Sequence, residues 1–404
     1  MNGNTGIVPK LRFPEFRDAG EWNEKELTKF TACGLSNGVF NDPKKVGTGY
    51  KLINVLDMYI DTVIDEKKLN LIELSKDEFI KNKVETGDIF FTRSSLVKSG
   101  IAYSNIYLGN SNDITFDGHL IRFRPNKIIL SPIFANYLLR TYRVRRQLVA
   151  RGKTATMTTI GQADVSSIKL SIPNLDEQQK ISDCLSSLDE LITVQTQKID
   201  GLKTHKKGLM QQLFPAEGET LPKLRFPEFQ DAGEWEEKPL ESICSSISSG
   251  KDKSDANGTY DLYGSTGVIG KTSSNTFAGN FILAARVGAN AGLLTRATGK
   301  FGVTDNTLVI FLKKSEKIDF IYYSLDRLGL NKMVFGSGQP LITGRQLKNL
   351  GINLPSPKEQ QKIADCLSSI DDLIAAVSQK IDALKNHKKG LMQQLFPSAD
   401  EVAG

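Results

Sequence analysis

Residues 172–215 read IPNLDEQQKISDCLSSLDELITVQTQKIDGLKTHKKGLMQQLFP. Nearly the same sequence returns at residues 354–397 as LPSPKEQQKIADCLSSIDDLIAAVSQKIDALKNHKKGLMQQLFP. At an offset of 182, 31 of the 44 positions are identical. A repeat of this size fixes the architecture, so it has to be recognised before any fold is assigned.

Both copies have the apolar spacing of a coiled-coil helix, with steps that alternate between four and three residues. Pro173 and Pro355 lie just before the expected helices, and Pro215 and Pro397 close them, at places where a helix tolerates proline. A helix of about 38 residues spans roughly 57 Å, which suits a spacer better than a core helix. The apolar seam positions are Ile181, Leu185, Leu188, Ile192, Ile199, Leu202, Leu209, Ile363, Leu367, Ile370, Ile374, Val377, Ile381, Leu384 and Leu391.

We expect the two helices to pack on each other, although each could instead cover the surface of its own domain. Lys206 and Lys388 interrupt the seam at equivalent positions. Such a polar position can fix the register of a coiled coil at a cost in stability. The alternative is that the helices separate at this level.

The bulk composition is that of an ordinary globular protein. A chain of 404 residues is expected to form two or three domains. No apolar run reaches membrane-spanning length, and MNGNTGIVPK lacks the apolar core of a signal peptide. None of the four cysteines lies in a CxxC pair, so we expect no zinc site and no disulfides. These features predict a cytoplasmic protein.

The positive charge lies between the repeats. Residues 28–171 contain 21 Lys/Arg and 13 Asp/Glu, a net charge of +8, and residues 241–353 contain 13 and 8, a net charge of +5. Because the whole chain carries +6, the remainder carries 6 − 13 = −7. Basic globular segments favour a polyanionic partner such as nucleic acid, although a solvated surface with a mild basic bias is the alternative.

A second repeat precedes each basic segment. PKLRFPEFRDAGEWNEKEL at residues 9–27 returns as PKLRFPEFQDAGEWEEKPL at residues 222–240, with 16 of 19 positions identical. We call each copy an LRFPEF segment. The two offsets differ by 31, so the first variable domain is longer by 31 residues. The predicted organisation is a domain at 1–171, a helix at 172–215, a domain at 216–353, and a helix with a tail at 354–404.

The first variable domain contains strand-like runs at 51–60, 88–92 and 119–125. Residues 131–150 have helical apolar spacing and carry Arg140, Arg143, Arg145 and Arg146. Residues 120–171 hold ten Lys/Arg and one acid, Asp164. Short hydroxyl side chains beside basic ones suit contacts to phosphates and base edges. The candidate DNA contacts in this domain are Arg93, Ser94, Ser95, Lys98, Lys153, Thr154 and Thr156.

The second variable domain has the same order in weaker form. GNFILAARVG at 279–288 resembles GDIFFTRSS at 87–95, since each run leads from a glycine through a strand to an arginine. Residues 335–355 likewise parallel 151–173. We therefore expect one fold with divergent exposed residues. The candidate DNA contacts here are Lys251, Lys253, Tyr263, Ser265, Arg286, Ser337, Gln339 and Thr343.

Catalytic and cofactor motifs are not evident. GSTGVIGKT at 264–272 superficially suggests a phosphate-binding loop, but Ser265 stands where that motif needs glycine. His205 and His387 are repeat equivalents on the helices, and His119 is interpreted as a satisfied core histidine in a strand. We expect no catalytic residues, no metal site and no cofactor bound by this chain.

These motifs and their order resemble the DNA-specificity subunit of bacterial type I restriction-modification enzymes. The similarity rests on the LRFPEF segments, the lead-ins PNLDEQQKI and PSPKEQQKI, and the HKKGLMQQLFP helix ends, and it covers nearly the whole chain. It implies an α+β fold: two similar target-recognition domains separated by two long helices that form an antiparallel coiled coil with pseudo-two-fold symmetry.

The resemblance also implies a function. In this family the subunit is non-catalytic, and each domain reads one half of a split target in double-stranded DNA. Two methyltransferase subunits and the restriction/translocase subunits are the expected partners, and S-adenosylmethionine, ATP and Mg are expected on those partners. The expected location is the bacterial cytoplasm, at the nucleoid. The alternatives are a structural scaffold with two basic binding domains and an enzyme fused to a recognition module. The fused enzyme would carry the cofactor motifs missing above.

Overall fold

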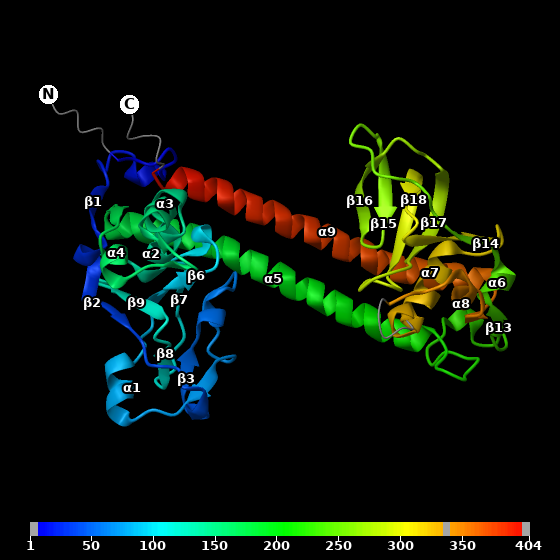
Figure 1. Ribbon diagram of the computed structural model, residues 1–404, viewed down its shortest axis with the longest axis horizontal. Helices are drawn as coiled ribbons and strands as arrows, with labels where there is room; N and C mark the ends of the chain where they lie inside the picture. Colours follow the sequence, from blue (N-terminus) through cyan, green and yellow to red (C-terminus); the bar gives the residue numbers. More distant parts are fainter. Residues whose placement is uncertain (1–6, 334–339, 398–404) are drawn as a thin grey trace. The chain divides into compact units, whose positions relative to one another are not determined.

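The structure is a computed structural model that describes residues 7–333 and 340–397 (Figure 1). The chain forms two compact units. Unit 1 comprises residues 1–194 and 380–404, and unit 2 comprises residues 195–379. Each unit therefore holds one variable domain together with half of each long helix.

The two long helices are α5 (Leu175–Leu213) and α9 (Pro357–Leu395). Each has 39 residues and is about 58 Å long. The side chain of Asn174 accepts a hydrogen bond from the Glu177 N–H, and Ser356 caps α9 through the Glu359 N–H in the same way. The caps explain why the helices begin a little after the predicted starts.

The helix halves run antiparallel within each unit. In unit 1, Ile181 and Leu185 near the start of α5 share a buried cluster with Leu395 at the end of α9. In unit 2, Leu213 at the end of α5 shares a cluster with Ile363 near the start of α9. All fifteen predicted seam residues are buried or half-buried. The ends of the helices are also part of the domain cores. Within each unit the helices therefore both pack on each other and cover their domain, so each of the two expected arrangements is partly right.

The polar seam positions are paired across the helices. In unit 1 the Lys388 ammonium donates to the Asp189 carboxylate at 2.5 and 2.6 Å and lies 4.9 Å from the Tyr137 ring centroid. The Tyr137 hydroxyl donates to the same carboxylate at 2.7 Å. This pairing favours a fixed register over separation of the helices.

Unit 2 repeats this arrangement with equivalent residues. The Lys206 ammonium donates to Asp371 Oδ1 at 2.6 Å and lies 4.8 Å from the Tyr323 ring centroid. The Tyr323 hydroxyl donates to Asp371 Oδ2 at 2.6 Å. In unit 2 Arg296 adds a second cation, 3.1 Å from Asp371.

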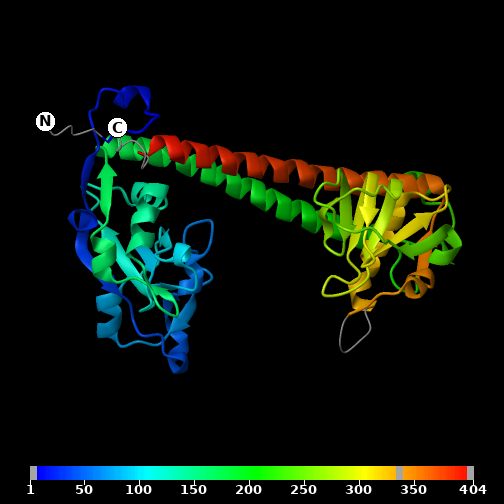
Figure 2. The ribbon, with the colours of Figure 1, turned by 45° about the horizontal axis from the view of Figure 1, so that its top comes forward.

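The second domain is built on a six-stranded sheet of order β14-β19-β17-β18-β15-β16 (Figure 2). All its neighbouring pairs are antiparallel except β15 and β18, which are parallel. One apolar face of the sheet packs on α7 and on the helix ends, and the other carries a separate cluster around Phe301. The elements of unit 2 are β13 (Glu236–Pro239), α6 (Leu240–Ile243), β14 (Cys244–Ser249), β15 (Tyr260–Gly264), β16 (Gly267–Thr272), β17 (Phe277–Ala285), β18 (Leu294–Val303), β19 (Thr307–Leu312), α7 (Ile318–Leu328), α8 (Gly344–Lys348) and β20 (Gly351–Leu354).

The first domain has the same strand order, but its sheet is divided into β2-β9-β5-β7 and β4-β3-β8. The division arises because the counterpart of β18 is interrupted: β7 pairs with β5, and β8 pairs with β3. The elements of unit 1 are β1 (Asn23–Glu26), β2 (Thr31–Asn37), β3 (Val46–Ile53), β4 (Asn70–Ile72), α1 (Lys76–Asn82), β5 (Ile89–Thr92), β6 (Ser94–Ser95), β7 (Ser104–Ile106), β8 (Ile114–Phe116), β9 (Leu120–Pro125), α2 (Pro132–Leu139), α3 (Tyr142–Arg151), β10 (Lys153–Thr154), β11 (Thr158–Thr159), α4 (Gln162–Ser166) and β12 (Lys169–Ile172).

Two predicted elements of the first domain were wrong in detail. The strand expected at 51–60 ends at Ile53, because Asn54 and Asp57 form a capping box that starts a 3-10 helix. The single helix expected at 131–150 is two helices, α2 and α3, and the Thr141 side chain bonds the Leu138 carbonyl at the break.

The LRFPEF segments occupy equivalent places in the two units. β1 pairs antiparallel with β12, as β13 pairs with β20, in the same register. Arg12 forms a bidentate ion pair with Glu177 in the first turn of α5, and Arg225 does so with Glu359 in α9. Trp22 and Trp235 are buried beside the helix ends. Each segment thus fixes a domain to the start of the helix that follows it.

Candidate nucleic-acid interface

The first domain gathers several chain segments around one turn, residues 117–120, which we call the central turn. The Asp117 N–H donates to the Ile53 carbonyl at 2.9 Å, and the Gly118 N–H donates to the Val39 carbonyl at 2.7 Å. The Arg93 N–H donates to the His119 carbonyl at 3.0 Å. The ends of β2, β3 and β5 therefore meet at this turn.

The second domain has the same central turn at residues 304–307. The Thr304 N–H donates to the Tyr263 carbonyl at 3.0 Å, and the Arg286 N–H donates to the Asn306 carbonyl at 2.8 Å. The Gly250 N–H donates to the Thr307 carbonyl at 3.2 Å. Two predicted contacts, Tyr263 and Arg286, and Gly250, the neighbour of the predicted Lys251, thus surround one turn although they come from distant parts of the sequence.

In each domain a glycine allows the backbone to lie close against the neighbouring strand. A Cβ on Gly38 would lie 1.9 Å from the Phe116 carbonyl oxygen, and one on Gly250 would lie 2.0 Å from the Val303 oxygen. Neither backbone can hold a larger residue at these two places without moving. The two glycines keep the central turn close to the neighbouring strand.

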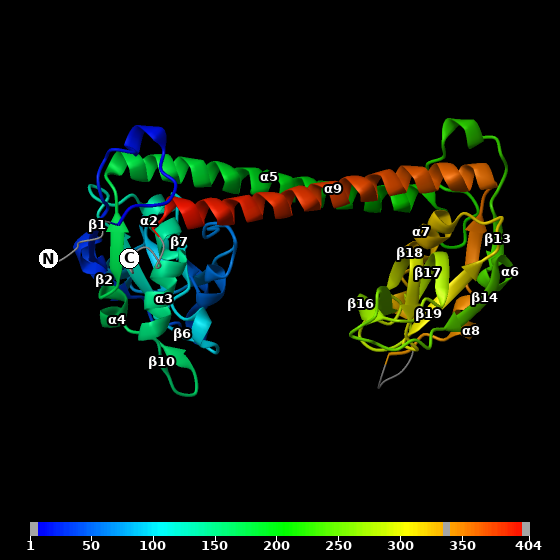
Figure 3. The same ribbon diagram turned by 90° about the horizontal axis from the view of Figure 1, so that it is seen from above.

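A second small sheet adjoins the first central turn and joins β10, β11 and β6 (Figure 3). Thr158 pairs with Ser95 and Thr159 with Ser94. The Ile160 N–H then donates to the Arg93 carbonyl, as the Ile342 N–H does to Arg286 in the second domain. The predicted candidates of the first domain, separated by some 60 positions in the sequence, consequently lie on one surface.

The candidate side chains of this surface are mostly exposed. The Arg93 guanidinium donates to the Gly118 carbonyl at 3.0 Å, which holds it against the central turn. Lys153 is 77% exposed, although Asp164 lies 3.5 Å away. Thr154 and Thr158 share a hydrogen bond of 3.0 Å. Lys98 and Thr156 are exposed as well, so the surface offers cations and hydroxyls to an anionic polymer.

The candidate residues of the second domain differ more in their exposure. Lys251 and Lys253 are exposed after Gly250, and Ser265 lies in the β15–β16 turn. The Tyr263 ring lies 5.2 Å from Phe301, and burial raises the pKa of Tyr263, so its hydroxyl stays protonated as a donor. Ser337 and Gln339 lie outside the described residues.

Thr343 has a structural role. Its hydroxyl accepts from the Gln346 N–H at 3.2 Å and lies 2.8 Å from Gln346 Oε1, which is a capping box at the start of α8. The Thr343 hydroxyl thus caps α8, and a contact from Thr343 to DNA stays a prediction.

Most of the basic side chains between 120 and 171 are occupied within unit 1. Arg145 donates to the carbonyls of Ala102, Ser99 and Ile101, and burial lowers its pKa. Arg146 alone among these ten has no hydrogen bond or ion pair to another described residue. The partnered ones are Arg122, Arg124, Lys127, Arg140, Arg143, Arg145, Arg151, Lys153 and Lys169. The local charge excess therefore overstates the charge available to a ligand.

Sequence reasoning missed three exposed residues at the central turns. His119 was expected in the core, but its side chain is 66% exposed, because it belongs to the turn before β9. Phe40 follows Val39 at this turn and is 79% exposed. Asn306 is exposed at the position equivalent to His119. The available signal was the similarity of DGHLIRFRP at 117–125 to TDNTLVIFLKK at 304–314, which aligns His119 with Asn306. The structure was needed to show that both residues are exposed.

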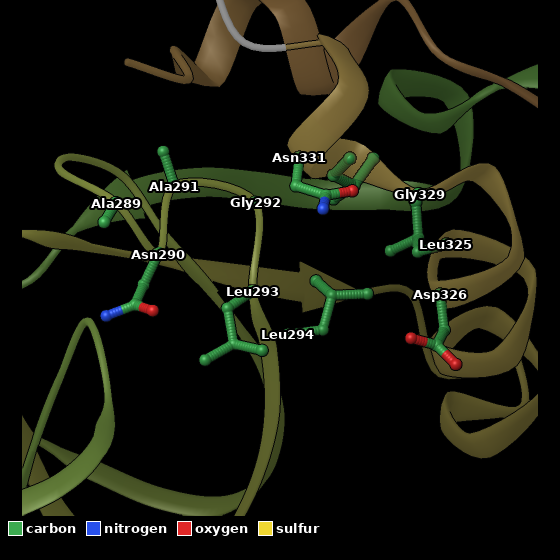
Figure 4. Close-up of a pocket in the computed structure, with 11 residues that line it drawn as sticks. Ala289, Asn290, Ala291, Gly292, Leu293, Leu294, Leu325, Asp326, Gly329 and Asn331 are labelled. Atoms are coloured by element: carbon green, nitrogen blue, oxygen red, sulfur yellow. The ribbon is translucent and has the colours of Figure 1, made fainter. Parts of the chain in front are cut away.

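Other features of the structure give weaker indications of a binding site. A pocket of about 250 Å³ lies between residues 289–294 and the end of α7 (Figure 4), smaller than most ligand sites. Residues 264–272 form the turn and second strand of the β15–β16 hairpin rather than a loop between a strand and a helix. Within 7–333 and 340–397 no cluster of three or more His, Cys, Asp or Glu could hold a metal ion. In the same ranges no helix is long and apolar enough to cross a membrane.

Comparison with known proteins agrees with this organisation. The family model described as type I restriction modification DNA specificity domain matches residues 40–204 and again residues 232–386. A sequence named as the specificity subunit of the type I restriction enzyme MjaX from Methanocaldococcus jannaschii is 26% identical, and the match covers 93% of each chain.

Solved structures show the same fold. The S subunit of a type I restriction-modification system from M. genitalium has a TM-score of 0.64 at 15% identity, covering 97% of this chain and 100% of that one. A chain from a structure of type I complex assembly has a TM-score of 0.54 at 16% identity, covering 93% and 98%. With two matches that together span most of its length, the chain belongs to the type I restriction-modification DNA specificity family.

Proposed function

We propose that this chain is the non-catalytic DNA-recognition subunit of a type I restriction-modification complex, in which each variable domain reads one half of a split target. The observation that carries this proposal is the repeated central turn. In both domains it lies against an arginine, Arg93 or Arg286, while the side chains around it differ. One fold with two different surfaces suits an asymmetric DNA sequence.

The residues that are repeated almost unchanged in the two LRFPEF segments and the two helix starts suggest where partner subunits dock. Lys180 pairs with Glu15 and lies 5.6 Å from the Phe13 ring centroid. In unit 2, Lys362 pairs with Glu228 in the same geometry beside Phe226. Two equal surfaces can bind two copies of one protein. We propose that these copies are methyltransferase subunits and that restriction/translocase subunits join them.

The chemistry in this proposal belongs to the partners. S-adenosylmethionine would serve adenine methylation on the methyltransferase subunits, and ATP and Mg would serve the restriction/translocase subunits. The chain itself supplies sequence recognition and position. The assembly would act on the nucleoid in the bacterial cytoplasm.

The long helices would set the distance between the two half-sites. Their paired lysines, Lys206 and Lys388, oppose sliding of one helix along the other, since each would lose its carboxylate partner. Dimeric DNA-binding proteins set the spacing of half-sites by comparable geometry. The gap in the target should therefore follow helix length.

A gel-shift titration over several salt concentrations, with the methyltransferase partner present, tests the proposal. We expect specific binding of one duplex from a mixed pool, and an affinity that falls steeply with salt as phosphate contacts are lost. Equal binding of all duplexes, or none, would favour the scaffold with two basic binding domains. Arg93→Ala should weaken binding, whereas Lys180→Ala should leave direct DNA contacts intact.

A further inference from the structure

We propose that His119 and Asn306 are specificity-determining residues that contact base edges from equivalent positions of the two domains. The inference rests on the proposed function and names side chains for it. Neither residue was among the candidates identified from the sequence.

The equivalence of the two positions follows from backbone hydrogen bonds. The His119 carbonyl accepts from Arg93, and the Asn306 carbonyl accepts from Arg286. In each turn the next residue closes the loop: the Leu120 N–H donates to the Asp117 carbonyl, and the Thr307 N–H donates to that of Thr304. The same backbone therefore presents an exposed histidine in one domain and an exposed asparagine in the other.

A buried carboxylate orients the histidine. Asp117 Oδ1 lies 2.7 Å from His119 Nδ1 and also accepts from the His119 N–H at 2.6 Å. The Asp117 side chain is 3% exposed, and both hydrogen bonds that it accepts from described residues come from His119. Burying a carboxylate is costly unless it is hydrogen-bonded, and its partner here is an exposed ring.

This contact determines what the ring can recognise. Because Nδ1 donates to Asp117 in the neutral ring, Nε2 is the acceptor that remains. In the major groove an acceptor pairs with the exocyclic amino group of adenine or cytosine. A ring held in place before binding loses less conformational freedom when it meets the base.

Asn306 offers different chemistry at the same position. Its amide makes no hydrogen bond to the residues that the structure describes, so both its oxygen and its NH₂ group are available. Asparagine can bond adenine N6 and N7 together. In each domain the neighbouring arginine, Arg93 or Arg286, can contact a phosphate or a guanine. The two turns would thus present different hydrogen-bonding groups to the DNA with one geometry.

Selection from a duplex pool with a randomised 30-base-pair segment tests the inference. The full-length chain is used with its methyltransferase partner, and the bound duplexes are sequenced. His119→Ala should relax one base position in one half-site, with a loss of discrimination of roughly five- to 150-fold. Asn306→Ala should relax one position in the other half-site. His387→Ala removes an exposed histidine from α9 and should preserve the wild-type sequence.

Asp117→Asn tests whether Asp117 positions the His119 ring. Because Asp117 is buried, it can act on the DNA only through that ring. The Asp117→Asn variant should relax the same base position as His119→Ala, while the half-site read by the second domain stays unchanged and reports that the chain is folded. If the wild type enriches a split sequence and His119→Ala and Asn306→Ala both enrich the identical one, this inference alone is overturned. If the wild type enriches no sequence, the proposed function fails with it.

Discussion

Arg12→Ala should destabilise unit 1 by removing the ion pair that fixes the first LRFPEF segment to α5. The Arg12 guanidinium donates to the two Glu177 carboxylate oxygens at 2.7 and 2.6 Å. The side chains are 7% and 1% exposed. Without its partner, Glu177 would be a buried, unpaired charge, and removing one member of such a pair costs about 3–5 kcal/mol of unfolding free energy.

Two further variants separate the ion pair from simple loss of contacts. Lys180→Ala breaks the exposed pair with Glu15 on the same segments and should have a much smaller effect, since solvent screens exposed pairs. Combining Arg12→Met with Glu177→Leu should recover most of the lost stability, because an apolar pair of similar volume leaves no charge buried.

The two tryptophans allow each unit to be followed separately. Trp22 is buried in unit 1 and Trp235 in unit 2, and the chain contains no other tryptophan. In a Trp235→Phe background, denaturant unfolding followed by Trp22 fluorescence should show the full loss. A shift of less than about 1 kcal/mol for Arg12→Ala would refute the ion-pair argument, and so would an equal shift in the transition that Trp235 reports in a Trp22→Phe background.

Three other changes have distinct expected outcomes. Lys388→Ala should lower the unfolding free energy by roughly 1–2 kcal/mol, and Lys206→Ala by less, because Arg296 still pairs with its partner; equal losses by calorimetry would count against this difference. Gly38→Ala should abolish selection of one half-site in duplex sequencing, and retention of both would show that the turn tolerates a Cβ. Asp326→Asn should stabilise unit 2 at neutral pH, because burial raises the pKa of Asp326. Because the protonated form of Asp326 favours folding, its stabilisation of the wild type is fully present below the unfolded pKa and is lost as the pH rises through the folded pKa. If the variant's unfolding, followed by Trp235, kept the acidic pH dependence of the wild type, this prediction would be contradicted.

The architecture could be predicted from the sequence because it is repeated. The offsets of 182 and 213 place Asn23 and Ile172 in the same relation as Glu236 and Leu354, and the structure pairs both couples in one register. A heptad seam defines the buried face of a helix by spacing alone. These features depend on local periodicity, which a sequence displays directly.

The surface around the central turns could be predicted only in part. Arg93 and Lys153 were identified by residue type, but only strand pairing places β10, β11 and β6 in one sheet. His119 was misplaced because a short polar turn before an apolar strand resembles the strand itself. Arg145 shows why local charge is a poor guide to a binding surface: its guanidinium donates to three backbone carbonyls inside the unit.

Sequencing the duplexes selected by a lengthened chain tests whether the long helices set the gap between the two half-sites. One heptad would be inserted in each helix, after Val194 and after Gln379, where the two units divide. Seven residues add about 10 Å, or about three base pairs at 3.4 Å each. We expect two unchanged sequence blocks separated by a longer gap. An unchanged gap, or one uninterrupted sequence block, would contradict it.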